Sequence, residues 1–202
     1  RLMGVRTAIH EQNSFPGITN RLLARIVDRV FISFEESGSH FPRYKVHVTG
    51  NPVREEFLGK MEGAVERPGG FTILVTGGSQ GASAINRAFI KALKKIKDMG
   101  EAPRIIYQTG QADFESVAEE YRDTGIEADV RPFINDMHNA YRQADIVIGR
   151  SGAGTVFELA AMGKPSILIP FPHAADDHQT ANARMLAGAG GAIMVPQDEL
   201  DP

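Results

Sequence analysis

Short apolar runs alternate with amphipathic stretches along almost the whole chain, and this alternation constrains the fold more than any single motif. The apolar runs predict β-strands at residues 5–9, 30–33, 46–49, 71–75, 104–107, 128–133, 145–149, 166–170 and 192–195. The stretches between them carry apolar residues at three- and four-residue spacing and predict helices at residues 19–29, 82–97, 112–123, 136–143, 153–162 and 177–188. Strict alternation of strand and helix implies parallel strands with right-handed crossovers. The sequence therefore predicts an α/β fold with a Rossmann-like, doubly wound parallel sheet.

Residues 59–70 (GKMEGAVERPGG) are polar, rich in glycine and without periodicity, which indicates a linker. We expect this linker to separate residues 1–58, the C-terminal part of one domain, from residues 71–202, a nearly complete second domain truncated at its end. Because residues 1–50 supply only two or three strands, we expect the chain to be part of a longer protein.

The composition excludes several classes of function. A formal net charge of −3 over 202 residues argues against a protein that binds nucleic acid through general positive charge. The chain has no cysteine, which excludes a disulfide framework, thiolate metal ligands and a cysteine nucleophile. With 42% hydrophobic residues, it can bury a substantial core. These values are typical of an ordinary globular protein.

Two glycine-containing turns each follow a predicted strand and lead into a predicted helix, at residues 75–83 (VTGGSQGAS) and 149–159 (GRSGAGTVFEL). Helix N-termini at the carboxyl edge of a parallel sheet present free N–H groups that attract anions. Each turn alone is as consistent with a plain strand-to-helix connection as with a phosphate site. Because two such turns face the same edge, together they favour a diphosphate.

The two glycine turns resemble familiar nucleotide-binding motifs but lack residues that those motifs require. The dinucleotide motif G-x-G-x-x-G would need glycine in place of Thr76 and an acidic residue near Gln108 or Thr109. A phosphate-binding loop would need lysine in place of Thr155. Neither NAD nor ATP is therefore favoured. Glu158 in the first turn of its helix could accept hydrogen bonds from ribose hydroxyls, or could simply complement the helix dipole.

A polar cluster follows the strand at 166–170, in the segment PHAADDHQTAN at residues 172–182. Its histidines and aspartates superficially resemble metal ligands, but no second group of ligands at a suitable spacing lies elsewhere in the chain. These residues are His173, Asp176, Asp177 and His178. The other interpretations are a ring of polar groups for sugar hydroxyls, to which Gln179 and Asn182 are suited, and a simple N-cap aspartate.

Two further polar segments lie near the start of the chain. HEQNSFPGITNR at residues 10–21 ends a predicted strand with four consecutive polar side chains, of which a structural cap needs only one. TGNPVREEF at 49–57 bends the chain at Asn51-Pro52 and then places Arg54, which suits a phosphate but could equally be a surface arginine.

Together these segments closely resemble the MurG family of UDP-N-acetylglucosamine transferases, within glycosyltransferase family 28. The resemblance runs in order from residue 1 to about residue 200, through HEQNSFPGITNRLLAR, VTGNPVR, LVTGGSQGASAIN, YQTG, PFINDM and the long segment from YRQADIV to QTANA. It implies a two-domain GT-B fold and an inverting transfer of GlcNAc from UDP-GlcNAc to undecaprenyl-diphospho-N-acetylmuramoyl-pentapeptide, without a cofactor or a protein-bound metal. The family acts as a peripheral protein on the cytoplasmic face of the bacterial inner membrane, which it contacts through its N-terminal domain.

The resemblance also implies roles for individual residues. Ser79 would contact the diphosphate, Ile134 would contact uracil through its backbone, and Arg54 would reach the diphosphate from the hinge. Asn13 and Gln179 would bind the GlcNAc hydroxyls. One segment would hold phosphate through its backbone N–H groups and ribose through its last residue, Glu158. It comprises Ala153, Gly154, Thr155, Val156, Phe157 and Glu158. His178 stands where some members carry glutamine.

The family's N-terminal GGTGGH loop, with the histidine proposed as general base, has no counterpart, and His10 does not match it. No catalytic residue is therefore assigned: the base is expected upstream of residue 1, and this chain is expected to bind donor without transferring GlcNAc. The alternatives are a UDP-sugar-binding module, another GT-B enzyme such as a UDP-GlcNAc epimerase, and, disfavoured by Thr76, a dinucleotide-dependent oxidoreductase.

Overall fold

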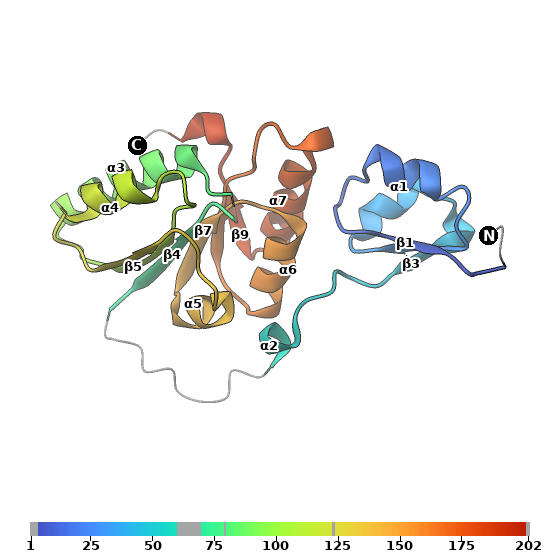
Figure 1. Ribbon diagram of the computed structural model, residues 1–202, viewed down its shortest axis with the longest axis horizontal. Helices are drawn as coiled ribbons and strands as arrows, with labels where there is room; N and C mark the ends of the chain where they lie inside the picture. The colour runs from blue at the N-terminus through green and yellow to red at the C-terminus, as the bar shows by residue number, and fades with distance from the viewer. Residues whose placement is uncertain (1–3, 60–69, 79, 123, 201–202) are drawn as a thin grey trace.

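The computed structural model describes residues 4–59, 70–78, 80–122 and 124–200, and these residues form two parallel sheets (Figure 1). The smaller sheet has the strand order β1-β2-β3. Its elements, and the short helix that follows it, are β1 (Ala8–Glu11), α1 (Ile18–Leu23), β2 (Arg29–Ile32), the 3-10 helices η1 (Glu35–His40) and η2 (Arg43–Lys45), β3 (Val46–Val48) and α2 (Glu55–Leu58).

The larger sheet has the order β6-β5-β4-β7-β8-β9, and each neighbouring pair is parallel. Its strands are β4 (Thr72–Thr76), β5 (Arg104–Gln108), β6 (Ala128–Arg131), β7 (Ile146–Gly149), β8 (Ser166–Leu168) and β9 (Ala192–Met194). Its helices are α3 (Ser83–Asp98), α4 (Phe114–Arg122), α5 (Met137–Gln143), α6 (Ala153–Ala161), η3 (Ala175–Asp177), α7 (His178–Gly188) and η4 (Gln197–Glu199).

The order of the larger sheet places a topological switch point between β4 and β7. From β4 the chain adds β5 and β6 on one side, then crosses to β7 and continues outward through β8 and β9. In open α/β sheets, ligands bind beyond the carboxyl ends of the strands at such a point. Because the two glycine turns follow β4 and β7, both lie at the switch point.

The predicted fold class is confirmed, and each predicted strand and helix has a counterpart at its expected place in the chain. The largest difference is α1, which was expected over residues 19–29 and ends at Leu23. Beyond it the N–H groups of Arg25 and Ile26 bond to carbonyls three residues earlier, so the chain tightens into turns. The buried Lys45 ammonium satisfies the carbonyls of Ala24 and Arg25 at 2.9 and 3.0 Å. Hydrophobic periodicity also did not predict α2, which is a helix of a single turn.

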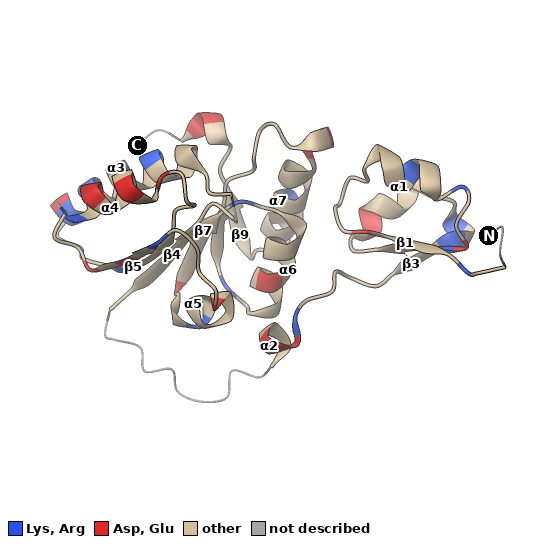
Figure 2. Cartoon of the chain, in the orientation of Figure 1, with Lys and Arg blue, Asp and Glu red and all other residues tan. Residues whose placement is uncertain are grey.

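Apolar side chains cover both faces of the larger sheet around β4, whose five residues are all buried. On one face Leu74 packs with residues of α5, α6 and α7, including Tyr141 and Leu159. On the other face Val75 packs with residues of α3 and α4, including Ile85. Figure 2 shows that charged residues gather on α3 and α4, which are the solvated outer helices.

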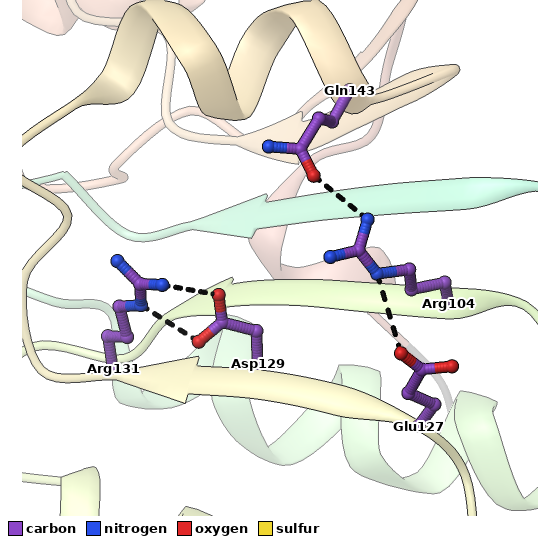
Figure 3. A network of polar contacts seen from close by, with 5 residues as sticks. All are labelled: Arg104, Glu127, Asp129, Arg131 and Gln143. Atoms are coloured by element: carbon purple, nitrogen blue, oxygen red, sulfur yellow. Dashed lines mark hydrogen bonds and ion pairs between the residues drawn. The ribbon is translucent and has the colours of Figure 1, made fainter. Parts of the chain in front are cut away.

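Charged residues also line the β6 edge of the larger sheet (Figure 3). Arg131 donates to both carboxylate oxygens of Asp129, at 2.8 and 2.7 Å, on the edge strand itself. Arg104 of β5 donates to Gln143 at the end of α5 at 2.8 Å and lies 3.7 Å from Glu127. Such charges discourage edge-to-edge pairing with another chain. No helix of the described residues is long and apolar enough to cross a membrane.

The smaller sheet and its connection contact the larger sheet through aromatic side chains. Phe34, which follows β2, packs against Phe157 of α6 with ring centres 5.0 Å apart. Phe57 of α2 is 1% exposed and lies in the core of the larger sheet, against Tyr141. Residues 60–69 of the expected linker lie outside the described residues. The division into 1–58, 59–70 and 71–202 therefore stays a prediction, although Phe57 packs with the second unit.

The turn after β4 requires glycine for steric reasons. A Cβ at Gly77 would lie 2.3 Å from the backbone nitrogen of Ala82, which opens α3. Gly81 has φ +78°, and a Cβ there would lie 2.5 Å from the carbonyl oxygen of Thr109. The N-terminus of α3 is thus pressed against the strand it follows and against the neighbouring turn.

We predict that Gly77→Ala lowers the free energy of unfolding by about 1–3 kcal/mol, the usual cost of forced overpacking. Its matched control is Gly154→Ala in α6, where a Cβ would meet no atom within 4 Å. That change should be neutral or stabilise by up to ~1 kcal/mol, because alanine favours helix. Urea denaturation of both variants is the measurement, and equal unfolding free energies would contradict the steric account.

Candidate functional site

Two adjoining hollows lie at the switch point, and Gly78 and Thr155 line both of them. The larger hollow has a volume of about 630 Å³ and is lined by the two glycine turns together with Arg150, Phe171 and Gln179. The smaller has a volume of about 280 Å³ and is lined by Arg54, Gln108, Ile134, Tyr141 and Glu158, among others. Because they share two lining residues, the two hollows lie side by side, as an elongated ligand would need, and together they are called the cleft.

The larger hollow collects the N-termini of two helices. Ala82 and Ser83 of α3 line it from one side, and Gly152 and Thr155 of α6 from the other. The N-cap residues of these helices are Ala82 and Gly152, whose side chains carry no group that could accept a hydrogen bond from the first turn. Within the part of the chain that the structure describes, no N-cap side chain occupies the first-turn N–H groups, and the two helix dipoles favour an anion.

Arg150 adds a cation to the larger hollow. Its guanidinium donates to the carbonyls of Ile169 and Pro170 at 3.1 and 3.0 Å and to Gln197 at 2.6 Å. It also lies 5.3 Å from the centre of the Phe171 ring. Burial lowers the pKa of Arg150, which nevertheless stays charged because an arginine starts so far above neutrality. The sequence reasoning missed Arg150; its place inside the second turn was the available signal.

Glu158 is the carboxylate of the smaller hollow. Its Oε2 accepts from the Tyr141 hydroxyl at 3.4 Å, and its Oε1 lies 3.8 Å from the Arg54 guanidinium. Burial raises the pKa of Glu158 above its ordinary value, while Arg54 and then Tyr141 oppose that rise. Arg54 is more than half exposed and also pairs with Glu56 at 3.0 Å. The predicted Arg54 and Glu158 thus lie together in one hollow, with an acceptor group available for hydroxyls.

Ile134 lines the same hollow, as expected, but its backbone N–H is engaged. It donates to Oε1 of Gln108 at 2.8 Å. A nucleobase that accepted a hydrogen bond from this N–H would have to displace the Gln108 side chain. In the sequence, Gln108 was noted as a position where an acidic residue is missing and as part of the YQTG segment, and its contact with the pocket was not predicted.

Asn13 and Gln179, which were expected to bind the same sugar, have different surroundings in the structure. Gln179 lines the larger hollow, and its Oε1 accepts from the N–H of Phe171 at 3.0 Å. The Oδ1 of Asn13 instead accepts from the buried Asn182 at 3.2 Å. Asn182 also accepts from the N–H and hydroxyl of Ser14 and donates to the Ser151 carbonyl. Asn182 therefore joins the loop after β1 to the turn before α6, and a sugar role for Asn13 stays a prediction.

The segment Ala153–Glu158 cannot hold phosphate along its whole length. α6 begins at Ala153, and the Val156 N–H already donates to the Gly152 carbonyl at 3.0 Å. By helix geometry the same applies to Phe157, so the free N–H groups are those of Ala153, Gly154 and Thr155. The Phe157 side chain packs on Phe34 instead.

Two expectations concern residues outside the cleft as described. Ser79 lies outside the described residues. His178 contacts the carbonyl of Ala175 at 2.7 Å through Nδ1, and Asp177 accepts from Thr180 at 2.6 Å. Within the ranges that the structure describes, no three His, Asp or Glu side chains form a group that could hold a metal ion.

Comparison with known proteins identifies relatives over nearly the full chain. Residues 72–202 match the family described as "Glycosyltransferase family 28 C-terminal domain". The chain is 50% identical over 200 residues to the UDP-N-acetylglucosamine--N-acetylmuramyl-(pentapeptide) pyrophosphoryl-undecaprenol N-acetylglucosamine transferase of Syntrophus aciditrophicus, covering 98% of this chain and 55% of that protein. It is 48% identical to the protein of the same name from Myxococcus xanthus, covering 98% and 52%. The chain thus spans about half the length of the curated relatives it matches.

Solved structures agree with these relatives. The crystal structure of Acinetobacter baumannii MurG matches with a TM-score of 0.80 at 38% identity, over 98% of this chain and 55% of that chain. The S. aureus MnaA-UDP co-structure matches with a TM-score of 0.67 at 14% identity, over 98% and 58% respectively, which supports the fold alone. The family match covers more than half of the chain. We conclude that the chain belongs to glycosyltransferase family 28.

Proposed function

We propose that the cleft binds the UDP group of UDP-GlcNAc, with the diphosphate in the larger hollow and the uridine in the smaller one. The single observation that carries this proposal is the meeting of two helix N-termini beside a half-buried carboxylate, Glu158. Backbone N–H groups suit a diphosphate, and a carboxylate suits the two hydroxyls of a ribose. The names of the relatives support the same donor.

In the whole protein, this donor would supply GlcNAc to undecaprenyl-diphospho-N-acetylmuramoyl-pentapeptide during peptidoglycan synthesis. A hydroxyl of the acceptor attacks the anomeric carbon and loses its proton to a general base, while the bond to the β-phosphate oxygen breaks, so negative charge develops on the departing UDP. The N–H groups of α3 and α6, with Arg150, are placed to stabilise that charge. Their positions are fixed before the reaction, so little reorganisation is needed.

The chemistry of the two proposed substrates supports a location of the whole protein at a membrane surface. The donor is a water-soluble nucleotide sugar, whereas the acceptor is anchored by its lipid. We therefore propose a peripheral protein at the cytoplasmic face of the bacterial inner membrane, whose partners are UDP-GlcNAc and the lipid-linked acceptor and which does not bind nucleic acid.

We predict that the chain binds UDP and UDP-GlcNAc in preference to TDP and NADH. The reason is that Glu158 and the Ile134 loop lie in the uridine hollow, beside the diphosphate turns. Calorimetric titration of the four ligands measures this preference, and equal affinities would contradict it. Turnover of UDP-GlcNAc without any lipid acceptor would instead favour an epimerase.

We predict that Glu158→Ala weakens UDP binding by ~1–3 kcal/mol, the scale of a charge-assisted hydrogen bond lost from a desolvated site. A pH series tests the same group. Because burial raises the pKa of Glu158, its carboxylate is protonated at a higher pH than an exposed glutamate would be. Uridine, which has no titrating phosphate, should therefore bind more weakly as the pH falls through that raised pKa.

The control for the pH series is Glu158→Gln, whose carboxamide does not titrate. Its affinity for uridine, followed by NMR, should be constant over the range in which the wild-type affinity falls. If both proteins give the same pH profile, Glu158 does not contact the ribose.

A further inference from the structure

Gln108 lies at the carboxyl end of β5, next to the switch point, and the residue is 2% exposed. Both ends of its carboxamide are engaged. Its Nε2 donates to the carbonyl of Gly78 at 2.9 Å and to the hydroxyl of Thr76 at 3.2 Å. Its Oε1 accepts from the N–H of Ile134 at 2.8 Å. One side chain thus joins the diphosphate turn after β4 to the loop after β6.

The two segments that Gln108 joins line different parts of the cleft. Gly78 is shared by both hollows, whereas Ile134 lines only the smaller one. The carboxamide is planar, so the positions of its oxygen and nitrogen relative to each other are fixed. A buried group of this kind sets the distance between the two segments more rigidly than packing alone.

Other contacts hold each segment separately. The Thr76 hydroxyl also accepts from the N–H of Gly78 at 3.1 Å, which supports the turn. The loop after β6 is held by N–H groups of Thr109 and Gly110, which donate to the carbonyls of Arg131 and Pro132. Those contacts end at residue 132. Among the described residues, the Gln108 carboxamide is the side chain that hydrogen-bonds both the Ile134 backbone and the turn, in addition to the packing of the buried Ile134 side chain in the core.

We propose that Gln108 is a positioning residue for base selectivity. By fixing the Ile134 backbone at a set distance from the diphosphate turn, it matches the cleft to a uridine diphosphate in preference to a purine nucleoside diphosphate. This inference rests on the proposed function, because it assumes that the smaller hollow receives the nucleoside. It assigns to Gln108 a role in selectivity that acts through the backbone of Ile134.

The test compares the affinities of the chain for UDP, ADP and inorganic pyrophosphate. Gln108→Met keeps a side chain of similar length but removes all three hydrogen bonds. It should weaken UDP binding ~10–100-fold, the range for one or two lost hydrogen bonds in a buried site. Pyrophosphate binding should change less than ~3-fold, because the N–H groups of α3 and α6 remain. The ratio of UDP to ADP affinity should fall at least tenfold.

Two further variants separate positioning from stability. Gln108→Glu can still accept from the Ile134 N–H but cannot donate to Gly78, and its charge opposes any diphosphate. Its charge should weaken the binding of all three ligands, and the ratio of UDP to ADP affinity should fall as it does in Gln108→Met, because the link to Gly78 is lost. Tyr107→Phe is the matched control, because it removes a buried hydrogen bond to Asn86 from the adjacent residue of the same strand. It should lower the melting temperature without changing the ratio.

An unchanged ratio of UDP to ADP affinity in Gln108→Met would overturn the inference. An equal loss of UDP, ADP and pyrophosphate binding in that variant would also overturn it, because it would indicate a purely structural role. A fall of the ratio in Tyr107→Phe as large as in Gln108→Met would also overturn it. A wild-type chain that binds UDP and ADP equally would overturn the proposed function itself, and this result is obtained before any variant is compared.

Discussion

The pairing of β4 with β7 is the constraint on which the cleft depends. These parallel strands are adjacent, and their last residues, Thr76 and Gly149, are directly paired. Both glycine turns therefore start at the same level of the sheet. A Cβ at Gly149 would lie 2.6 Å from the Thr76 carbonyl oxygen, so this close approach itself requires glycine. Because the strands are held at one register, the helices that follow them direct their N-termini into one hollow.

The charges within the cleft, rather than the net charge of the chain, determine what the cleft can bind. The chain carries a formal charge of −3, yet the larger hollow gathers the partial positive charge of two helix N-termini and the guanidinium of Arg150. The smaller hollow contains a carboxylate whose ionisation is opposed by burial and supported by Arg54 and Tyr141. The cleft thus offers an anion site beside an acceptor site, which are the two requirements of a nucleoside diphosphate.

Much of the fold and part of the site could be predicted because their signals are local in the sequence. Hydrophobic periodicity predicted the alternating strands and helices, and the glycine turns and Glu158 were found from their place relative to those elements. The contacts of Gln108 and Asn182 could not be predicted, since they join segments 26 and 168 residues apart. The reduced set of free N–H groups in α6 depended on where the helix starts, and sequence patterns fix helix ends poorly.

We propose that one ligand spans both hollows at the switch point. Amide NMR shifts of the 15N-labelled chain during addition of UDP test this claim most directly. We expect large shifts at Gly77, Gly78 and Ala84, at Gly152 to Thr155, and at Ile134, all of which line the cleft or open its helices. Only small shifts are expected in the smaller sheet, away from α6. Shifts confined to other surfaces, or to only one of the two hollows, would contradict the proposal.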